Sequence, residues 1–435
     1  MSYDTFRQTF SHKKILLFGF GLLGGGKASL TTFQSIPCEI VITDQKSETE
    51  LHDALSQTNT KNIHHLTLGR HTEEDIDWAD IIVKNPAVPT SNTFIQQAIK
   101  KNKHITTDAA LYLKYSQATT VGITGTRGKT TTTLLTHHLI SKGLNRQVLI
   151  GGNIKDAGSL PLLLTETPDS IVVLELSSFA LEGCHWEKVS PHYAAITNLY
   201  PDHMNRHASM EEYAYEKSAI FAYQKKEDHL FLNKSDEWAK KWEPEIHSHL
   251  HFVNPTEIEG VQLMPLKGTH NQWNAAFAIS IANALGVTLE SIKMNLPSFI
   301  GAPFRQQNLG TKNGMTFIND STSTTPEAVM VALETFPTAN LIIGGTTKFL
   351  NLSKLADQLD HYKGHLFCLK GSGTSELLTK MKTQHKIYDS LQEAFFAAIE
   401  DKPNEVVFSP GFTSFELFDN EFDRAEQFSN LVKEL

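Results

Sequence analysis

The stretch from Val121 to Thr133, VGITGTRGKTTTT, decides the fold of this chain. It runs from an apolar segment through Gly125 and Gly128 to the pair Lys129 and Thr130, and it leads into LLTHHLI, whose leucines recur at helical spacing. This order of strand, tight loop and helix is typical of a phosphate-binding loop, in which the lysine reaches the terminal phosphates and the threonine holds Mg²⁺. We therefore predict a nucleoside triphosphate ligand, although position 123 is Ile where the strict pattern has glycine.

A second glycine-rich loop lies near the N-terminus. The apolar run KILLF is followed by Gly19, Gly21 and Gly24 in G-x-G-x-x-G spacing, and a further apolar run ends in Asp44. This is the order of a Rossmann-like unit, with phosphate near the glycines and ribose or uracil near the acidic strand end. The spacing alone also fits a tight turn that binds nothing.

Strands alternate with helices along the whole chain, which predicts an α/β protein with parallel sheets. A length of 435 residues is enough for about three domains. We predict a Rossmann-like domain over residues 1–105, a central domain with a P-loop ATPase-like parallel sheet over 106–299, and a Rossmann-like α/β domain over 300–435. The stretch 104–115 is interpreted as a connector between the first two domains.

The composition argues against several classes of protein. A net charge of −9, from 39 basic and 48 acidic residues, argues against nonspecific nucleic-acid binding. The three widely spaced cysteines suggest neither a disulfide framework nor a thiolate zinc site. The N-terminus lacks the apolar core of a signal peptide, and no apolar run reaches membrane-spanning length. We predict a cytoplasmic protein that does not insert into membranes.

Polar residues follow several of the predicted central strands. Asn153, Glu175 and Asn198 end apolar runs, and the carboxyl ends of parallel strands are where a phosphate loop needs partners. Glu175 is expected to face a metal or a basic group, because an unpaired buried carboxylate is costly, although a solvated strand end is also possible. His203, in YPDHMNRH, fits a metal ligand and a structural loop histidine equally well.

Seven motifs in order resemble those of the Mur ligases, the ATP-dependent amide-bond ligases of peptidoglycan precursor synthesis. They are GTRGKTTT, GGNI, LELSSFALE, ITNLYPDHMNRHASMEEYAYEKSAIF, GTHNQWNAA, FRQQ and INDSTSTTPEA. The resemblance spans nearly the whole chain. It implies addition of D-glutamate to UDP-N-acetylmuramoyl-L-alanine through an acyl phosphate, by a monomer that uses ATP and two Mg²⁺ ions.

The resemblance also implies roles for individual residues. Lys129, His203 and Lys217 would be catalytic. ATP would be bound by Gly125, Thr126, Arg127, Gly128, Lys129, Thr130, Thr131, Asn271, Arg305 and Asp320. The metal ligands would be Thr130, Glu175, His203 and a carbamylated Lys217. The UDP-substrate would contact Leu22, Leu23, Asp44, Lys46, Asn153 and Ser177. The amino acid would contact Thr324, Lys348, Ser414 and Phe422.

The amino-acid site departs from the family pattern. Thr322 stands in DSTST where members of the family have a lysine two residues after the aspartate, and Ala87 replaces a usual glycine near the uracil. Three alternatives therefore stay open. They are the same chemistry with L-glutamate or another amino acid, a different ligase of the superfamily, and a non-catalytic ATP-binding relative. A nicotinamide dehydrogenase built on the first glycine loop would have no use for the second.

Overall fold

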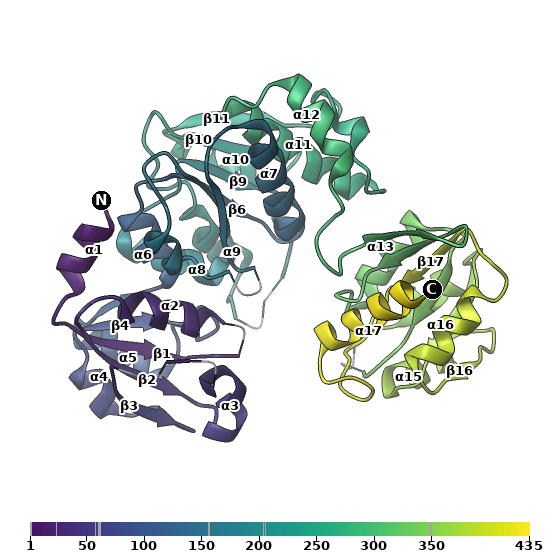
Figure 1. Cartoon of the computed structure of the whole chain (residues 1–435), viewed down its shortest axis with the longest axis horizontal. Helices are drawn as coiled ribbons and strands as arrows, with labels where there is room; N and C mark the ends of the chain where they lie inside the picture. Colours follow the sequence, from purple (N-terminus) through teal and green to yellow (C-terminus); the bar gives the residue numbers. More distant parts are fainter. Residues whose placement is uncertain are drawn as a thin grey trace. The chain divides into compact units, whose positions relative to one another are not determined.

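The computed structural model describes residues 2–22, 24–56, 58, 59, 62–154, 157–202, 204, 206–347 and 350–435. The described residues form three β-sheets with helices on their faces (Figure 1). Two compact units contain them. The first unit comprises residues 1–263 with 272–296, and the second comprises 264–271 with 297–435. The α/β class predicted from the sequence is confirmed.

The first sheet has five parallel strands in the order β3-β2-β1-β4-β5. Its strands are β1 (Lys14–Phe18), β2 (Glu39–Asp44), β3 (Ile63–Leu68), β4 (Ile81–Lys84) and β5 (His104–Thr106). Its helices are α1 (Tyr3–Phe10), α2 (Gly25–Gln34), α3 (Glu48–Ser56), α4 (Glu73–Trp78), α5 (Thr93–Lys100) and α6 (Asp108–Tyr115). Strand order reverses at β1, and the crevice at such a switch point is where open α/β sheets bind ligands.

The second sheet has six parallel strands in the order β11-β10-β9-β6-β8-β7. Its strands are β6 (Thr119–Thr124), β7 (Val148–Gly152), β8 (Ile171–Glu175), β9 (Tyr193–Ile196), β10 (His229–Asn233) and β11 (His249–Val253). Its helices are α7 (Lys129–Gly143), α8 (Ser178–Glu187), α9 (Met210–Ser218), α10 (Glu237–Trp242), α11 (Thr269–Ala284) and α12 (Leu289–Asn295), and η1 (Leu160–Leu164) is a 3₁₀ turn. β6 lies between β8 and β9, so the ends of both neighbours flank the loop that follows it.

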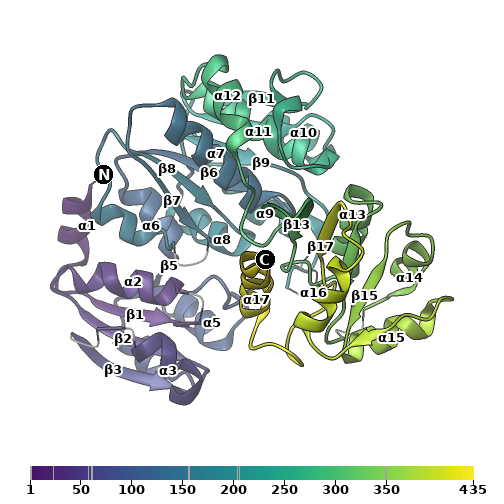
Figure 2. The same ribbon diagram turned by 45° about the vertical axis from the view of Figure 1, so that its right-hand side comes forward.

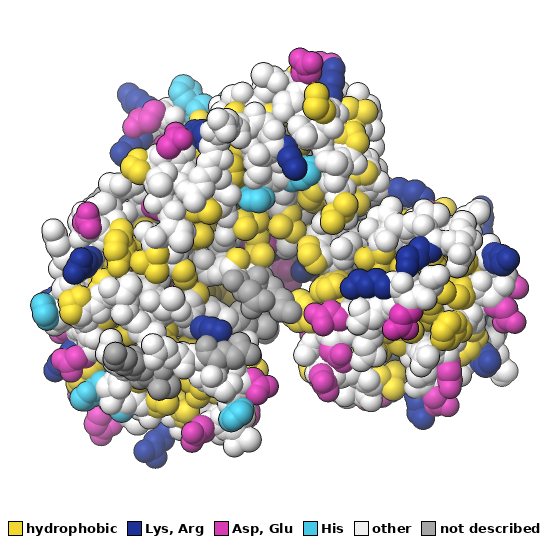
Figure 3. All heavy atoms as spheres, viewed as in Figure 1, with side chains coloured by type: hydrophobic (Ala, Val, Ile, Leu, Met, Phe, Trp, Pro, Cys, Tyr) yellow, Lys and Arg dark blue, Asp and Glu magenta, His cyan; other side chains and the backbone are white. Residues whose placement is uncertain are grey.

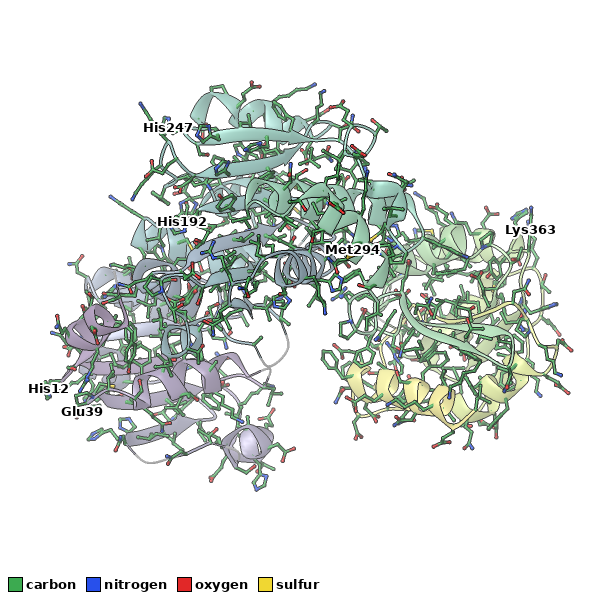
Figure 4. All side chains as sticks on the ribbon, turned by 45° about the horizontal axis from the view of Figure 1, so that its top comes forward. His12, Glu39, His192, His247, Met294 and Lys363 are labelled. Atoms are coloured by element: carbon green, nitrogen blue, oxygen red, sulfur yellow. The ribbon has the colours of Figure 1, made fainter. Side chains whose placement is uncertain are left out.

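Figure 4 shows which end of the second sheet is which. His192 lies directly before β9, and His247 lies shortly before β11. Because the strands are parallel, both histidines mark the edge formed by the amino ends. The phosphate loop follows the carboxyl end of β6 and therefore lies at the opposite edge.

The first two sheets share one hydrophobic core. Ile15 and Leu17 of β1, Leu111 of α6, and Val172 and Leu174 of β8 belong to the same buried cluster. In Figures 1 and 2 helices α2, α6 and α8 lie between the two sheets. This continuous core explains why both sheets belong to one compact unit, while the predicted boundary after residue 105 stays a prediction.

The stretch 104–115, interpreted as a connector, is structured. It forms β5, which completes the first sheet, and α6, which carries buried side chains into the shared core. The connection between the first two sheets is therefore made of regular secondary structure. In the structure Thr107 caps α6 by accepting a hydrogen bond from Ala110 N at 3.4 Å.

The second unit contains a mixed six-stranded sheet in the order β12-β13-β17-β14-β15-β16, with the edge pair β12 and β13 antiparallel. Its strands are β12 (Gln307–Lys312), β13 (Met315–Asn319), β14 (Asn340–Ile343), β15 (Leu366–Leu369), β16 (Ile387–Tyr388) and β17 (Glu405–Phe408). Its helices are α13 (Pro326–Thr335), α14 (Ser353–Asp360), α15 (Ser372–Lys380), α16 (Leu391–Ile399) and α17 (Glu421–Glu434).

Surface features agree with the composition. Figure 3 shows acidic and basic side chains interspersed over the visible face of each unit. Within the described residues, no helix is both long enough and apolar enough to span a membrane.

Candidate active site

The phosphate loop occupies residues 125–128, between β6 and α7. Gly125 has φ of 147° and Gly128 has φ of 83°, both in the region that side chains disfavour. A Cβ atom on Gly125 would lie 2.0 Å from Oγ1 of Thr197, and one on Gly128 would lie 2.4 Å from Oδ1 of Asn274. Glycine is therefore required at both positions for the loop to close onto its neighbours.

The end of β9 holds this loop in place. Asn198 Oδ1 accepts a hydrogen bond from Arg127 N at 2.9 Å, and Asn198 Nδ2 donates to Arg127 O at 3.0 Å. Thr197 Oγ1 also donates to Arg127 O, at 2.7 Å. Thr126 N donates to Asn198 O at 3.0 Å. The prediction that Asn198 lies beside the phosphate loop is confirmed, and the loop is preformed at the N-terminus of α7, where anions bind.

Two lysines converge on the carbonyl oxygen of Gly125. Lys129 Nζ donates to Gly125 O at 3.0 Å and to Thr126 O at 3.2 Å. Lys217 Nζ, from α9, donates to Gly125 O and to Thr124 Oγ1, both at 3.2 Å. The structure thus brings together two of the residues that were predicted to be catalytic.

Lys217 is 1% exposed, and its Nζ lies 4.7 Å from the centre of the Tyr213 ring. Burial holds the pKa of Lys217 well below its ordinary value, and repulsion from Lys129 lowers this pKa further, although Asp202 and Glu175 act in the opposite direction. A lowered pKa favours the neutral amine, which is nucleophilic. This burial excludes a solvated lysine that forms an ion pair at the surface.

Glu175 ends β8 beside the loop and is 2% exposed. Its Oε1 accepts a hydrogen bond from Asn153 Nδ2 at 3.3 Å. Its Oε2 is buried without a hydrogen-bond partner among the described residues. A solvated strand end is therefore excluded, and a buried carboxylate oxygen without a donor fits a cation ligand.

His203 lies outside the described residues, as do Leu23 and Lys348. Asp202, its neighbour in the chain, bonds Arg127 of the phosphate loop through Oδ2 and NH1 at 3.1 Å. Among the described residues, no group of three or more His, Cys, Asp or Glu side chains is arranged to hold a metal. The two-metal arrangement stays a prediction.

The first glycine loop is tied to the end of β2. Asp44 is 7% exposed, and its two carboxylate oxygens accept hydrogen bonds from Gly21 N at 2.9 Å and from Lys46 N at 2.8 Å. Leu22, within the loop, is 53% exposed. Lys46 pairs with Glu50 at 3.8 Å across exposed side chains. The carboxylate of Asp44 therefore holds the glycine loop through the backbone N–H of Gly21. Leu22 belongs to this loop, and Lys46 lies beside Asp44 at the end of β2.

Ser177 caps the N-terminus of α8, where its Oγ accepts a hydrogen bond from Ala180 N at 3.1 Å. Asn153 follows β7 and is exposed apart from its bond to Glu175. Both residues lie at the carboxyl edge of the second sheet, since β7 and β8 are parallel neighbours of one another.

Asp320, Arg305 and Asn271 belong to the second unit. Asp320 accepts hydrogen bonds from Gln306 N at 3.0 Å, from Ser323 Oγ at 2.5 Å and from Ser409 Oγ at 2.7 Å. Burial raises the pKa of Asp320 to about 6, although these donors and Arg305 lower it. Asn271 is 3% exposed and donates to Lys267 O at 2.8 Å.

The backbone around Arg305 is strained. Phe304 and Gln306 have φ of 61° and 44°, which residues other than glycine rarely adopt. Thr322 stabilises this turn, because its N and its Oγ1 both donate to Phe304 O, at 3.1 and 2.8 Å. The threonine that replaces the family lysine is therefore engaged in holding the turn that presents Arg305, and strain of this kind is often found at functional sites.

A small cavity in the second unit contains part of the predicted amino-acid site. It is lined by Thr324, Pro326, Thr346, Thr347, Leu350, Leu352, Gly411 and Phe412. Ser414 follows shortly after Phe412, and its buried Oγ has no hydrogen-bond partner among the described residues. Phe422 contacts the ring of Phe304, with ring centres 6.5 Å apart. These positions place Thr324 on the cavity wall, whereas Ser414 is buried and is not among the lining residues.

Sequence reasoning missed Arg424, the fully buried arginine of the second unit. Its guanidinium donates to Phe412 O at 2.9 Å and to Ser321 O at 2.7 Å, so it joins two loops that flank the cavity. Burial lowers its pKa to about 10. Its position on an amphipathic helix gave no signal of this role. Arg206, in the segment between β9 and α9, was also missed, because its carbonyl partners lie in a distant part of the chain.

The fold and this site define an ATP-dependent enzyme built around a phosphate loop with a buried lysine and an unsatisfied carboxylate. Residues 123–253 match the model of the Mur ligase middle domain. Two relatives are named UDP-N-acetylmuramoylalanine–D-glutamate ligase. The one from Roseiflexus sp. is 30% identical over 97% of this chain and 98% of its own, and the one from Borreliella burgdorferi is 33% identical over 97% of each. The chain belongs to the Mur ligase family.

Solved structures share the fold at low sequence identity. A UDP-N-acetylmuramate–alanine ligase from Thermotoga maritima superposes with a TM-score of 0.60 and 18% identity, over 97% of this chain and 100% of its own. MurF ligase from the same organism, solved in complex with ADP, gives 0.59 and 18%, over 99% and 97%. As a Mur ligase, the chain is an ATP-dependent, ADP-forming amide ligase.

Replacing Gly125 with alanine tests the geometry of the phosphate loop. The contact with Thr197 and the positive φ predict a loss of about 1–3 kcal/mol in the free energy of unfolding and at least a tenfold loss of affinity for ADP with Mg²⁺. Denaturant unfolding and calorimetric titration measure the two effects. Gly25→Ala is the control, since no atom lies within 4 Å of its added Cβ. Equal affinities in both variants would contradict the expected geometry.

Proposed function

We propose that this chain joins D-glutamate to UDP-N-acetylmuramoyl-L-alanine and couples this reaction to the cleavage of ATP to ADP and phosphate. The relatives that carry this name match the chain from end to end at 30–33% identity. The observation that carries the proposal is that the phosphate loop has two buried ionisable groups beside it: Lys217, which donates to Gly125 O, and Glu175, whose Oε2 has no donor among the described residues. A simple ATPase has no anionic acceptor substrate to bring against the γ-phosphate. It would therefore have less need for two buried ionisable groups, Lys217 and Glu175, beside the phosphate loop.

The reaction has two steps. The terminal carboxylate of the alanyl substrate attacks the γ-phosphorus, and the bond to the β–γ bridging oxygen breaks, which gives an acyl phosphate and ADP. The amino group of D-glutamate then attacks the acyl carbonyl, the amide bond forms, and phosphate leaves as the nitrogen loses a proton. Both steps bring anions together, so positive groups that neutralise the developing charge are the main requirement.

This chain supplies such groups at the phosphate loop. The N–H groups of residues 125–131 and the N-terminus of α7 would bind the β- and γ-phosphates, and Lys129 would turn from its loop carbonyls to the γ-phosphate. MurF ligase from Thermotoga maritima, which shares the fold, was solved with ADP. Asn271, Arg305 and Asp320 would complete the ATP site, with the carboxylate of Asp320 on the ribose.

The oxygen donors beside the phosphate loop suit Mg²⁺. Thr130 Oγ1 and the free Glu175 Oε2 are hard oxygen ligands of the kind Mg²⁺ prefers. His203 and a carbamylated Lys217 would hold the second ion, and Mg²⁺ bound there would offset the repulsion between the two anions.

The surroundings of Lys217 support its carbamylation. Its lowered pKa favours the neutral amine, which adds to the carbon of CO₂; the nitrogen then loses its proton and an anionic carbamate remains. The carbamate would introduce an anion at a point where Lys129 already supplies positive charge. Lys217 would thereby become a metal ligand.

The remaining substrate contacts follow the predicted sets. Leu22, Leu23, Asp44 and Lys46 would bind the uridine diphosphate end, and Asn153 and Ser177 the sugar. Thr324, Lys348, Ser414 and Phe422 would bind the incoming amino acid. A monomeric state and a cytoplasmic location stay predictions from the sequence.

The acceptor is tested by phosphate release from the purified chain with UDP-N-acetylmuramoyl-L-alanine, ATP and Mg²⁺. Candidate amino acids are D-glutamate, L-glutamate, D-aspartate and L-alanine. We expect turnover with D-glutamate to exceed that with each of the others by at least 100-fold in kcat/KM, and mass spectrometry to detect the amide product. Turnover with L-glutamate alone would reject the stereochemical assignment. Release of phosphate without any amide product would reject ligation.

A further inference from the structure

The guanidinium of Arg206 is bound to three consecutive carbonyl groups. NH1 donates to Ala87 O at 2.7 Å, and NH2 donates to Pro86 O at 2.8 Å and to Val88 O at 2.9 Å. Arg206 belongs to the segment between β9 and α9 of the second sheet, whereas its partners belong to the loop after β4 of the first sheet. One side chain therefore fixes the backbone of a loop that lies about 120 residues away in the chain.

This loop forms a wall of the cavity at the first glycine loop. Asn85 N donates to Phe18 O at 2.8 Å, which continues the pairing of β4 with β1. A Cβ on Gly19 would lie 2.9 Å from Val88 Cγ2, so the loop and the glycine turn are in close contact. The cavity is lined by Leu17, Gly19, Gly25, Gly26, Ser29, Val83, Lys84, Asn85, Pro86 and Asp108. It lies at the switch point of the first sheet, where the proposed function puts the uridine diphosphate.

Aromatic and acidic side chains surround the two cations that bind this loop, Arg206 and Lys84. The guanidinium carbon lies 3.8 Å from the centre of the Phe179 ring. Burial lowers the pKa of Arg206, whereas the charges of Glu182 and Glu216 raise it. Lys84 Nζ, which is fully buried, donates to Val88 O at 2.7 Å and pairs with Glu182 at the same distance. The loop is thus fastened by two cations, and their counter-charges come from helices of the second sheet.

We propose that Arg206 is a positioning residue for the nucleotide-sugar substrate and that it acts by fixing the Pro86–Val88 backbone as a wall of the uridine diphosphate site. The loop lacks regular secondary structure, so its conformation depends on these contacts. When the loop is fixed before binding, the ligand does not have to order it, and affinity is higher. The proposal rests on the proposed function only for the identity of the ligand.

The test compares Arg206→Met and Arg206→Lys with the wild-type chain. Methionine keeps an apolar side chain against Phe179 but donates no hydrogen bond, and lysine keeps the charge without the planar fork that spans three carbonyls. Arg146→Met is the matched control, because Arg146 is a partly buried arginine of the same unit that bonds Asp169 O at 2.8 Å. Calorimetric titration with UDP and, separately, with ADP plus Mg²⁺ gives the affinities without requiring turnover.

We expect Arg206→Met to lose 10- to 100-fold in UDP affinity and to keep ADP affinity within twofold, with Arg206→Lys in between and Arg146→Met unchanged for both ligands. In steady state KM for the UDP-substrate should rise by the same factor, while KM for ATP stays within twofold. Equal losses for UDP and ADP, or no loss for UDP, would overturn the proposal. If Arg206→Met does not fold, Arg206→Lys decides by the same criteria.

The two proposals fail separately. UDP binding that depends on Arg206, in a chain that forms no amide, would support the positioning role and reject the ligase reaction. Amide formation with UDP affinity that is insensitive to Arg206 would do the reverse.

Discussion

Lys217→Ala is expected to abolish ligation, with a fall of at least about 10³-fold in kcat/KM. The physical reason is the position of Nζ, which is 3.2 Å from both Gly125 O and Thr124 Oγ1 and is sealed from solvent at 1% exposure. Burial and Lys129 hold the pKa of this amine well below the ordinary value, which favours the neutral amine that the proposed carbamylation requires. Alanine removes both the amine and any carbamate, and with them the predicted ligand of the second Mg²⁺.

Chemical rescue separates this role from a structural one. Alanine leaves a cavity beside the phosphate loop. Acetate or propionate that enters this cavity supplies a carboxylate and should raise the activity of Lys217→Ala at least tenfold over its activity without the acid. Lys217→Met is the matched control, because its side chain fills the space and should resist rescue. Labelling of the wild-type chain with ¹³C-bicarbonate should add a carbamate resonance that both variants lack. Wild-type activity in Lys217→Ala would remove the role altogether.

Glu175→Gln is expected to raise the Mg²⁺ concentration for half-maximal activity at least tenfold and to lower kcat/KM about 10²-fold. Glutamine keeps the shape of the side chain and an oxygen for the hydrogen bond from Asn153. It removes the charge of the oxygen that has no donor among the described residues. Titration of activity with Mg²⁺ at saturating ATP measures the change.

Glu187→Gln is the control for a buried carboxylate. Glu187 is the last residue of α8. It pairs with His104 at 2.7 Å and with Lys114 at 2.5 Å. Burial raises the pKa of Glu187, but the hydrogen bonds from His104 and Lys114 outweigh burial and lower this pKa to about 2. This variant should lower Tm without changing the Mg²⁺ requirement. An unchanged Mg²⁺ requirement in Glu175→Gln would refute the metal role of Glu175.

The fold class followed from patterns that are local in sequence. Apolar runs such as Lys14–Phe18 and Ile171–Glu175 became the buried parallel strands β1 and β8, because a strand covered on both faces needs apolar residues at every position. Gly125 and Gly128 also produced the expected loop, since positive φ and close packing against Thr197 and Asn274 leave room for no other residue.

Contacts between segments that are distant in the chain could not be predicted from the sequence. Thr107 was expected in a connector but caps a helix of the shared core. Thr322 was noted as a missing lysine, and in the structure its hydroxyl holds the turn that presents Arg305. Arg206 and Arg424 each join loops that lie far apart in the chain. Arg206 stands in the YPDHMNRH motif, but the motif does not show which carbonyl groups it binds, and Arg424 belongs to no recognised motif. Such roles depend on which backbone carbonyls lack partners, and only the folded chain determines that.

The sequence by itself determined the α/β fold class, the phosphate loop and the order of motifs that places the chain among the Mur ligases. Its information is local, because strand, turn and helix preferences act over a few residues. Only the tertiary structure decided that Lys217 is a buried amine with a lowered pKa and that Glu175 has a carboxylate oxygen without a donor. Both properties arise from desolvation and neighbouring charge, which residues distant in the sequence create when β6, β8 and α9 pack together.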